Sequence, residues 1–155
     1  MKKEPFVTKE QLDAIVKEYP TPFHLYDEKG IRANAQAVKD AFSWNKGYKE
    51  YFAVKATPNP FLIKILHEYG CGCDCSSLAE LVLSDACDIR GEDIMFSAND
   101  TPAEEFVKAE ELGAIINLDD FTHIAFLEET LGHIPETISL RYNPGGVYEI
   151  SNGIM

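Results

Sequence analysis

Three ionisable residues stand at equivalent places along this chain and could do chemistry together. Lys55 ends the run Tyr51–Lys55, Asp74 lies in a cysteine-rich run, and Arg141 follows Ile138–Leu140. Side chains alternate between the two faces of a strand, so each of the three falls opposite its apolar neighbours. A lysine amine can form a Schiff base with a carbonyl compound, a carboxylate can stabilise a cation, and an arginine can anchor an anion.

From their spacing alone, a catalytic role and a purely structural role explain the arrangement of these three residues equally well. An unpaired charge inside a protein is costly, so the three residues predict either a reactive site or an ion-pair network in the centre of a barrel. Ala53 is small, precedes Lys55 by two positions on the same face, and leaves space for a flat ring. Both interpretations stay open at this point.

Five short β-type segments position these residues. They begin near Tyr48, Cys71, Asp93, Ile115 and Thr137, at spacings of 23, 22, 22 and 22 residues. Helical segments lie between them, and their start and stop signals are Asn59–Pro60, Ser77–Glu80, Thr101–Glu104, Gly70, Gly113 and Gly132. Strands that alternate with helices run parallel with right-handed crossovers. The predicted fold class is α/β, either an eight-stranded barrel or an open doubly wound sheet.

Residues 1–44 precede this pattern, and residues 45–155 form the predicted partial barrel. Thr8–Gln11 is a capping box that predicts a helix ending before Pro20. Phe23–Tyr26 predicts a short strand, and a second helix is expected over about Lys29–Phe42. At the other end, Ser151–Met155 follows the fifth strand without a closing helix. A barrel needs about eight strands and roughly 250 residues, so we expect a truncated chain; the alternative is a complete five-stranded domain.

Composition limits the possible partners. The formal net charge is −12, from 14 basic and 26 acidic residues, which argues against binding to nucleic acid or anionic membranes. No apolar run could cross a bilayer or serve as a signal peptide, so we expect a cytoplasmic protein. The four cysteines include no Cys-x-x-Cys pair, and Cys71, Cys73 and Cys75 share one strand face. We expect thiols packed under helices and no metal site.

Four segments of the chain resemble the diaminopimelate decarboxylases, which belong to the alanine-racemase-fold, or fold-type III, enzymes that depend on pyridoxal phosphate. The segments are Thr21–Asp27, Tyr51–Ala56, Cys73–Leu81 and Leu140–Gly145. Tyr-Phe-Ala-Val-Lys-Ala is similar to the family's Tyr-Ala-Val-Lys-Ala-Asn, and Leu-Arg-Tyr-Asn-Pro-Gly to its Leu-Arg-x-Asn-Pro-Gly. The resemblance covers nearly the whole chain from Thr21 onward.

This resemblance implies a fold, a cofactor and a reaction. The fold is a (β/α)8 TIM-type barrel with about five of its eight βα units present, and residues 22–27 belong to a second, β-rich domain. Pyridoxal 5′-phosphate is held covalently by Lys55, beside Ala53 and Arg141. Asp74 is the second catalytic residue, near the substrate amine, and Glu80 and Asn143 support the site. The implied reaction converts meso-diaminopimelate to L-lysine and CO2, in a homodimer of the full-length protein.

Two departures from the family pattern keep other functions open. Thr57 stands where the family usually has Asn, and Gly146–Asn152 replaces a Thr-His continuation. The alternatives are a carboxynorspermidine or other basic-amino-acid decarboxylase, and a non-catalytic homologue that acts as a binding module. The family's phosphate-binding loop and pyridine-pairing glutamate would lie beyond residue 155, so we expect the 155-residue chain alone to be inactive.

Overall fold

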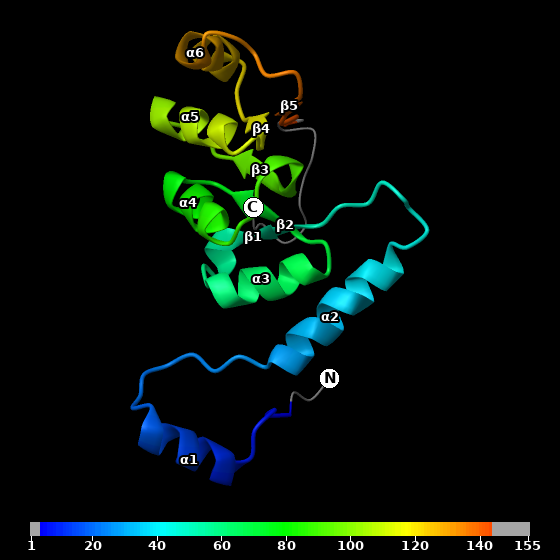
Figure 1. The fold of residues 1–155 in the computed structure, drawn as a ribbon, viewed down its shortest axis with the longest axis vertical. Coiled ribbons are helices and arrows are strands. Elements are labelled where there is room, and N and C mark those ends of the chain that lie inside the picture. The colour runs from blue at the N-terminus through cyan, green and yellow to red at the C-terminus, as the bar shows by residue number, and fades with distance from the viewer. Residues whose placement is uncertain (1–3, 144–155) are drawn as a thin grey trace. The chain divides into compact units, whose positions relative to one another are not determined.

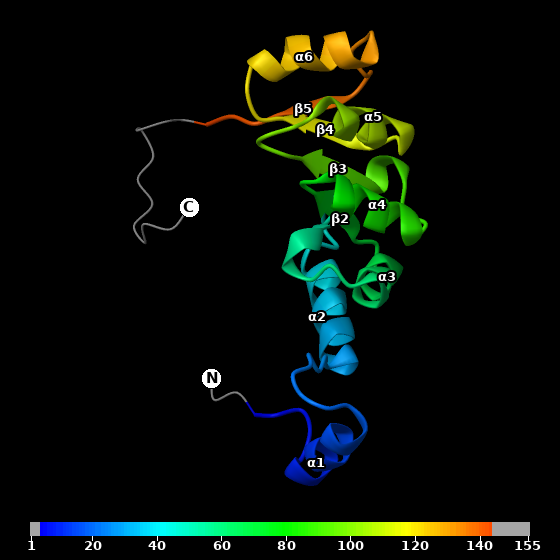
Figure 2. The ribbon, with the colours of Figure 1, turned by 90° about the vertical axis from the view of Figure 1, so that its left-hand side faces the viewer.

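The computed structural model describes residues 4–143, which divide into two units after Phe42 (Figures 1 and 2). The predicted motif residues Pro144 and Gly145, the departure at Gly146–Asn152 and the segment Ser151–Met155 lie outside the described residues. Each unit is described by itself. The predicted boundary after residue 44 falls two residues from the observed division.

The first unit contains two helices, α1 (Lys9–Glu18) and α2 (Glu28–Ala41). The capping box at Thr8 is confirmed, because its hydroxyl accepts from the Gln11 N–H at 3.2 Å and its own N–H donates to the Gln11 side chain at 2.8 Å. Asp27 caps α2 by accepting from the Gly30 N–H at 3.0 Å. The helix predicted over about Lys29–Phe42 is therefore confirmed to within a residue at each end.

The strand predicted at Phe23–Tyr26 does not form. Residues 23–27 have no strand pairing with any described part of the chain. A strand is stable only when its N–H and C=O groups find a neighbouring strand, and a favourable sequence pattern does not supply one. The assignment of residues 22–27 to a second domain stays a prediction.

The second unit is a parallel sheet of five strands that alternate with helices. The strands are β1 (Tyr51–Ala53), β2 (Gly72–Cys75), β3 (Ile94–Ser97), β4 (Ile115–Leu118) and β5 (Ile138–Leu140). The α-helices are α3 (Pro60–Glu68), α4 (Leu78–Ala86), α5 (Ala103–Glu111) and α6 (Thr122–Leu131). Two short 3₁₀ turns, η1 (Val54–Ala56) and η2 (Gly91–Asp93), complete the described elements.

The strand order decides between the two predicted architectures. The strands lie in the order β1-β2-β3-β4-β5, and each pairs in parallel with the next. A doubly wound sheet reverses its order at a switch point and carries helices on both faces. Here α4, α5 and α6 follow one another along one side of the sheet (Figures 1 and 2). Sequential parallel strands with helices on one side are the arrangement of a β/α barrel, so the predicted α/β fold is confirmed.

The helix boundaries follow local signals, with one exception. Asn59 caps α3 ahead of Pro60, accepting from the Phe61 N–H at 3.0 Å, and Gly132 ends α6 in the left-handed region. The capping box predicted at Thr101 is wrong. Pro102 is extended (φ −62°, ψ 152°), so α5 begins only at Ala103 and Pro102 takes the N-cap position. Thr101 is buried and precedes the N-cap by one residue, so it does not cap the helix.

The core lies between the sheet and the helices. Cys73, Cys75 and Phe96 are fully buried there against helix residues such as Leu81 and Phe106. The prediction of thiols packed under helices is therefore confirmed for the two strand cysteines. Burial raises the pKa of Cys75 to about 12, because the charged thiolate has no water around it. Within residues 4–143, no helix is both long and apolar enough to cross a membrane.

Candidate functional site

The side of the sheet away from the helices carries polar side chains near the carboxyl ends of the strands; we call this side the polar face. It is formed by Ala53, Asp74, Ser97, Asn117 and Ser139, which are all half-buried. In the central strands β2, β3 and β4, their sequence neighbours on the other side of the sheet, Cys75, Phe96 and Leu118 among them, are buried. This contrast confirms the alternation expected for a sheet covered by helices on one side.

Hydrogen bonds join neighbouring strands across the polar face. Ala53 pairs in register with Asp74, and Ser97 pairs with Asn117. The Ser97 hydroxyl donates to Asp74 Oδ1 at 2.5 Å, and the Ser139 hydroxyl donates to Asn117 Oδ1 at 2.8 Å. Each of these two hydrogen bonds therefore joins a pair of neighbouring strands, β2 with β3 and β4 with β5.

Lys55 lies just past the end of β1. The strand predicted for Tyr51–Lys55 is shorter than expected, because the chain turns into η1, where the Thr57 N–H donates to the Val54 carbonyl at 3.1 Å. Val54 is fully buried, whereas Lys55 is exposed. Among the described residues Lys55 forms no hydrogen bond or ion pair, so it is not joined to Asp74. Its amine is open to reaction but is not held against the acid of the next strand.

The loop that follows Asp74 is fixed by Glu80. Glu80 Oε1 accepts from the hydroxyls of Ser76 and Ser77, each at 3.0 Å, and its Oε2 accepts from the Ser76 N–H at 3.2 Å. The capping box predicted at Ser77–Glu80 is thus present with one difference. The Glu80 side chain accepts from the N–H of Ser76, which precedes the N-cap residue Ser77, and not from the N–H of Ser77 itself. Leu78, the first residue of α4, donates its N–H to Glu105 Oε1 at 2.8 Å. Both acids hold the segment next to Asp74.

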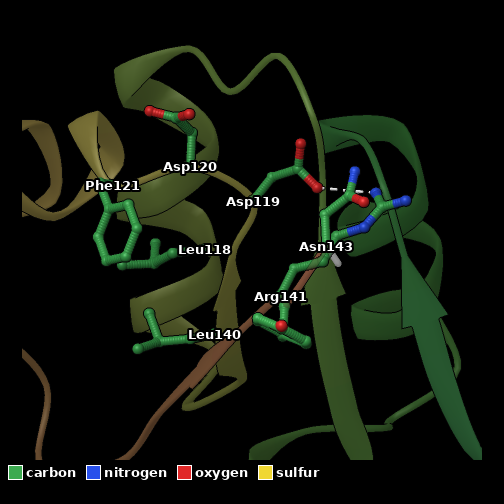
Figure 3. A pocket seen from close by; sticks show the side chains of 8 residues that line it. Leu118, Asp119, Asp120, Phe121, Leu140, Arg141 and Asn143 are labelled. Atoms are coloured by element: carbon green, nitrogen blue, oxygen red, sulfur yellow. Dashed lines mark hydrogen bonds and ion pairs between the residues drawn. The ribbon is translucent and has the colours of Figure 1, made fainter. Parts of the chain in front are cut away.

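Arg141 follows β5 and forms an ion pair with Asp119, which follows β4. Arg141 Nη1 lies 2.7 Å from Asp119 Oδ1 (Figure 3). Asp74 stands in β2 and bonds to Ser97, whereas Arg141 directly follows β5 and bonds to Asp119, and no hydrogen bond or ion pair among the described residues joins Arg141 to Asp74 or Lys55. The structure therefore does not bring Arg141 into contact with Lys55 or Asp74.

A cavity of about 490 Å³ opens beside this ion pair. Arg141, Asp119 and Asn143 lie together on one side of it, and Leu118, Leu140 and Phe121 lie on the other (Figure 3). Asp120 points away from the ion pair and accepts from the Thr122 hydroxyl at 2.7 Å and the Thr122 N–H at 2.8 Å. These two donors lower the pKa of Asp120. The cavity combines a charged wall with an apolar one.

Four residues of this region were missed by the sequence analysis as functional candidates. Ser97 and Asn117 lie on the same face of their strands as Asp74 does on β2. This shared face in the strand alternation is the sequence signal that could have identified them. Asp119 directly follows β4 and pairs with Arg141 across the ends of neighbouring strands. Glu105 is a buried acid on the helix layer, and no sequence signal marks it. No group of three or more His, Cys, Asp or Glu residues that could hold a metal occurs within residues 4–143.

A run of consecutive parallel βα units, each strand followed by a helix on the same side of the sheet, defines the class of β/α-barrel proteins, in which ligands bind at the carboxyl ends of the strands. Residues 28–151 match the family model described as "Pyridoxal-dependent decarboxylase, pyridoxal binding domain". The chain belongs to this family, as the resemblance of its motifs predicted.

Individual relatives agree with this membership. Protein TabA of Pseudomonas amygdali pv. tabaci is 39% identical over 136 residues, which cover 88% of this chain and 31% of TabA. The diaminopimelate decarboxylase of Thermoplasma acidophilum is 32% identical over 134 residues, covering 86% and 32%. The solved diaminopimelate decarboxylase of Helicobacter pylori, complexed with L-lysine, is 30% identical with a TM-score of 0.77, covering 86% and 34%. The chain spans about a third of the length of the curated relatives it matches.

Proposed function

We propose that this chain supplies the cofactor-holding part of a pyridoxal-phosphate-dependent amino-acid decarboxylase, with Lys55 as the residue that holds the cofactor. The observation that supports it best is the position of Lys55, an exposed amine directly after the first strand, in a chain of the pyridoxal-binding family. Lysine amines form Schiff bases with aldehydes when they are accessible and uncharged.

The residues around Lys55 fit such a cofactor. Ala53, two residues earlier, has only a methyl side chain and pairs in register with Asp74, so Ala53 itself takes up little space beside the acid. Asp74 accepts one described hydrogen bond, from Ser97, which leaves acceptor capacity on its carboxylate. An open amine, a small neighbour and an acid with a spare oxygen suit a flat aldehyde that carries a cationic nitrogen.

Each residue would have a separate task. When bound, pyridoxal phosphate supplies an electron sink for the charge left on the α-carbon as CO2 departs. Lys55 would hold the aldehyde through Nζ and would later exchange a proton at the same atom. Asp74 would bind the substrate ammonium. Arg141, paired with Asp119, would contribute a hydrogen-bonding wall with little net charge, and Glu80 would keep the loop after Asp74 in position.

The proposed substrate is meso-diaminopimelate, with L-lysine and CO2 as the products. Diaminopimelate decarboxylases of Thermoplasma acidophilum, Helicobacter pylori and Methanothermobacter thermautotrophicus are 31–32% identical to this chain and support this choice. The proposal extends to a homodimer of the whole protein, in the cytoplasm, acting in lysine biosynthesis. A second candidate comes from the L-glutamyl-[BtrI acyl-carrier protein] decarboxylase of Niallia circulans, 27% identical, whose name describes a carrier-bound amino acid as substrate. A carboxynorspermidine or other basic-amino-acid decarboxylase remains a further alternative.

Trapping with borohydride tests the role of Lys55. The whole protein is incubated with pyridoxal phosphate, reduced with borohydride, digested, and mapped by mass spectrometry. We expect the phosphopyridoxyl group on the Lys55 peptide, and its loss in Lys55→Ala. Lys64→Ala is the matched control, because Lys64 is an exposed lysine on α3 of the same unit and should leave the labelling of Lys55 unchanged. Labelling spread evenly over Lys64 and other surface lysines would contradict the proposal.

The substrate is tested separately, on the whole protein. CO2 release is measured with meso-diaminopimelate, L-lysine, L-ornithine, carboxynorspermidine and a glutamyl-carrier conjugate. We expect the highest kcat/KM for meso-diaminopimelate. A higher value for the conjugate would select the second candidate, and no release from any of the five would reject the decarboxylase activity.

A further inference from the structure

The hydrogen bond between Ser97 and Asp74 is among the shortest side-chain contacts on the polar face. Ser97 Oγ lies 2.5 Å from Asp74 Oδ1, within the range of hydroxyls that donate to charged carboxylates. The two residues stand on neighbouring strands, β3 and β2, near their carboxyl ends. Both side chains are half-buried, so water competes only in part for this contact.

The backbone on both sides of the bond is fixed. Ser97 lies between Phe96 and Ala98, which are 0% and 4% exposed, and Asp74 lies between Cys73 and Cys75, which are 1% and 0% exposed. Neither strand can rotate to move its polar residue without lifting core side chains out of the helix layer. The serine hydroxyl therefore restricts the rotamer of the Asp74 carboxylate, and no other described residue is bonded to that side chain.

We propose that Ser97 is a positioning residue for Asp74: its hydroxyl occupies Oδ1 and turns Oδ2 into the acceptor for a cationic amine nitrogen at the site. A carboxylate has lone pairs on both oxygens, so one short bond to a serine leaves the other oxygen free to accept. The proposal rests on the proposed function, because the nitrogen belongs to the cofactor-bound lysine or to the amino group of the substrate.

The test reads the protonation of that nitrogen by spectroscopy. The visible absorbance band of the whole protein with pyridoxal phosphate on Lys55 is titrated with pH in the wild type, Ser97→Ala, Ser97→Thr, Asp74→Asn and the double variant Ser97→Ala/Asp74→Asn. Ser139→Ala is the matched control, since Ser139 also donates to the neighbouring strand on the polar face but contacts Asn117 instead of Asp74. Circular dichroism confirms that each variant is folded.

We expect Ser97→Ala to lower the midpoint pH at which the absorbance band changes by roughly 0.7 pH unit. This shift is about a fivefold change in the protonation equilibrium of the nitrogen, which matches the loss of one hydrogen bond. Ser97→Thr keeps a hydroxyl and should restore the midpoint. In the Asp74→Asn background, Ser97→Ala should change nothing further, which a general loss of packing at position 97 would not produce.

Three results would overturn the inference, each in a different way. If the band forms and Ser97→Ala titrates like the wild type, Ser97 does not act through Asp74, and the proposed function survives. If no band forms and borohydride traps no cofactor on Lys55, the proposed function is wrong, and the inference about Ser97 is wrong with it. An equal shift in Ser139→Ala would likewise overturn it, because the effect would then not depend on Asp74.

Discussion

Replacing Glu80 with alanine should loosen the segment that follows Asp74. The substitution removes three hydrogen bonds, two from serine hydroxyls and one from the Ser76 N–H. Each is worth about 0.5–1.5 kcal/mol net, and water replaces part of each because Glu80 is only half-buried. We therefore expect a loss of about 2 kcal/mol in the free energy of unfolding, which lowers Tm by roughly 4–8 °C in a chain of this size.

Urea denaturation followed by circular dichroism measures this loss. Glu80→Gln should cost less, because its amide oxygen still accepts from the serine hydroxyls. Glu104→Ala is the control, since Glu104 is an exposed acid in the first turn of α5. A Glu80→Ala variant whose free energy of unfolding lies within about 0.5 kcal/mol of the wild type would refute the reasoning, because exposed acids away from such contacts cost no more than that.

Two further predictions concern the strand β2. In Gly72→Ala, the new Cβ would lie 2.5 Å from the Asp93 carbonyl oxygen and 2.8 Å from the Tyr51 ring, so we expect a loss of about 2–3 kcal/mol in urea denaturation; Gly47→Ala, whose nearest contact is 3.6 Å away, should be nearly neutral. For Cys75, burial raises the pKa to about 12 from the ordinary value of 9.0, so the folded state favours the protonated thiol. Its contribution to stability is complete below pH 9 and falls as the pH rises toward 12, and Cys75→Val should show a smaller drop in the urea midpoint between about pH 8 and pH 11 than the wild type.

The sheet could be predicted from the sequence because its signals are local. The strands predicted near Cys71, Asp93 and Ile115 begin at Gly72, Ile94 and Ile115. The prediction was least accurate at β1, which begins at Tyr51 although the β-type run begins near Tyr48. Strand bounds depend on the partner, and β2 offers its first paired residue, Gly72, opposite Tyr51. A single-sequence pattern contains no information about where a partner begins.

The site was predicted only in its parts. The alternation of strand residues correctly indicated that Asp74 lies opposite the buried cysteines. It could not indicate that Ser97 bonds to Asp74, because that contact depends on how β3 registers against β2. It also could not show that the chain turns at Val54, which takes Lys55 out of the strand pattern. Contacts between segments about 22 residues apart follow from tertiary structure, to which local propensity contributes little.

The pairing of polar groups near the strand ends leaves Lys55 without a bonded partner among the described residues. Asp74 is bonded to Ser97, and Arg141 is bonded to Asp119, so each of these charges already has a partner in the fold. Within residues 4–143, Lys55 has no such partner at the strand ends. Forming a Schiff base at Lys55 therefore breaks no contact that stabilises the sheet, whereas a reaction that displaced either pair would leave a half-buried charge unsatisfied. A covalent group on Lys55 would therefore displace no hydrogen bond or ion pair described within residues 4–143, which suits the proposed role of this lysine in holding a cofactor.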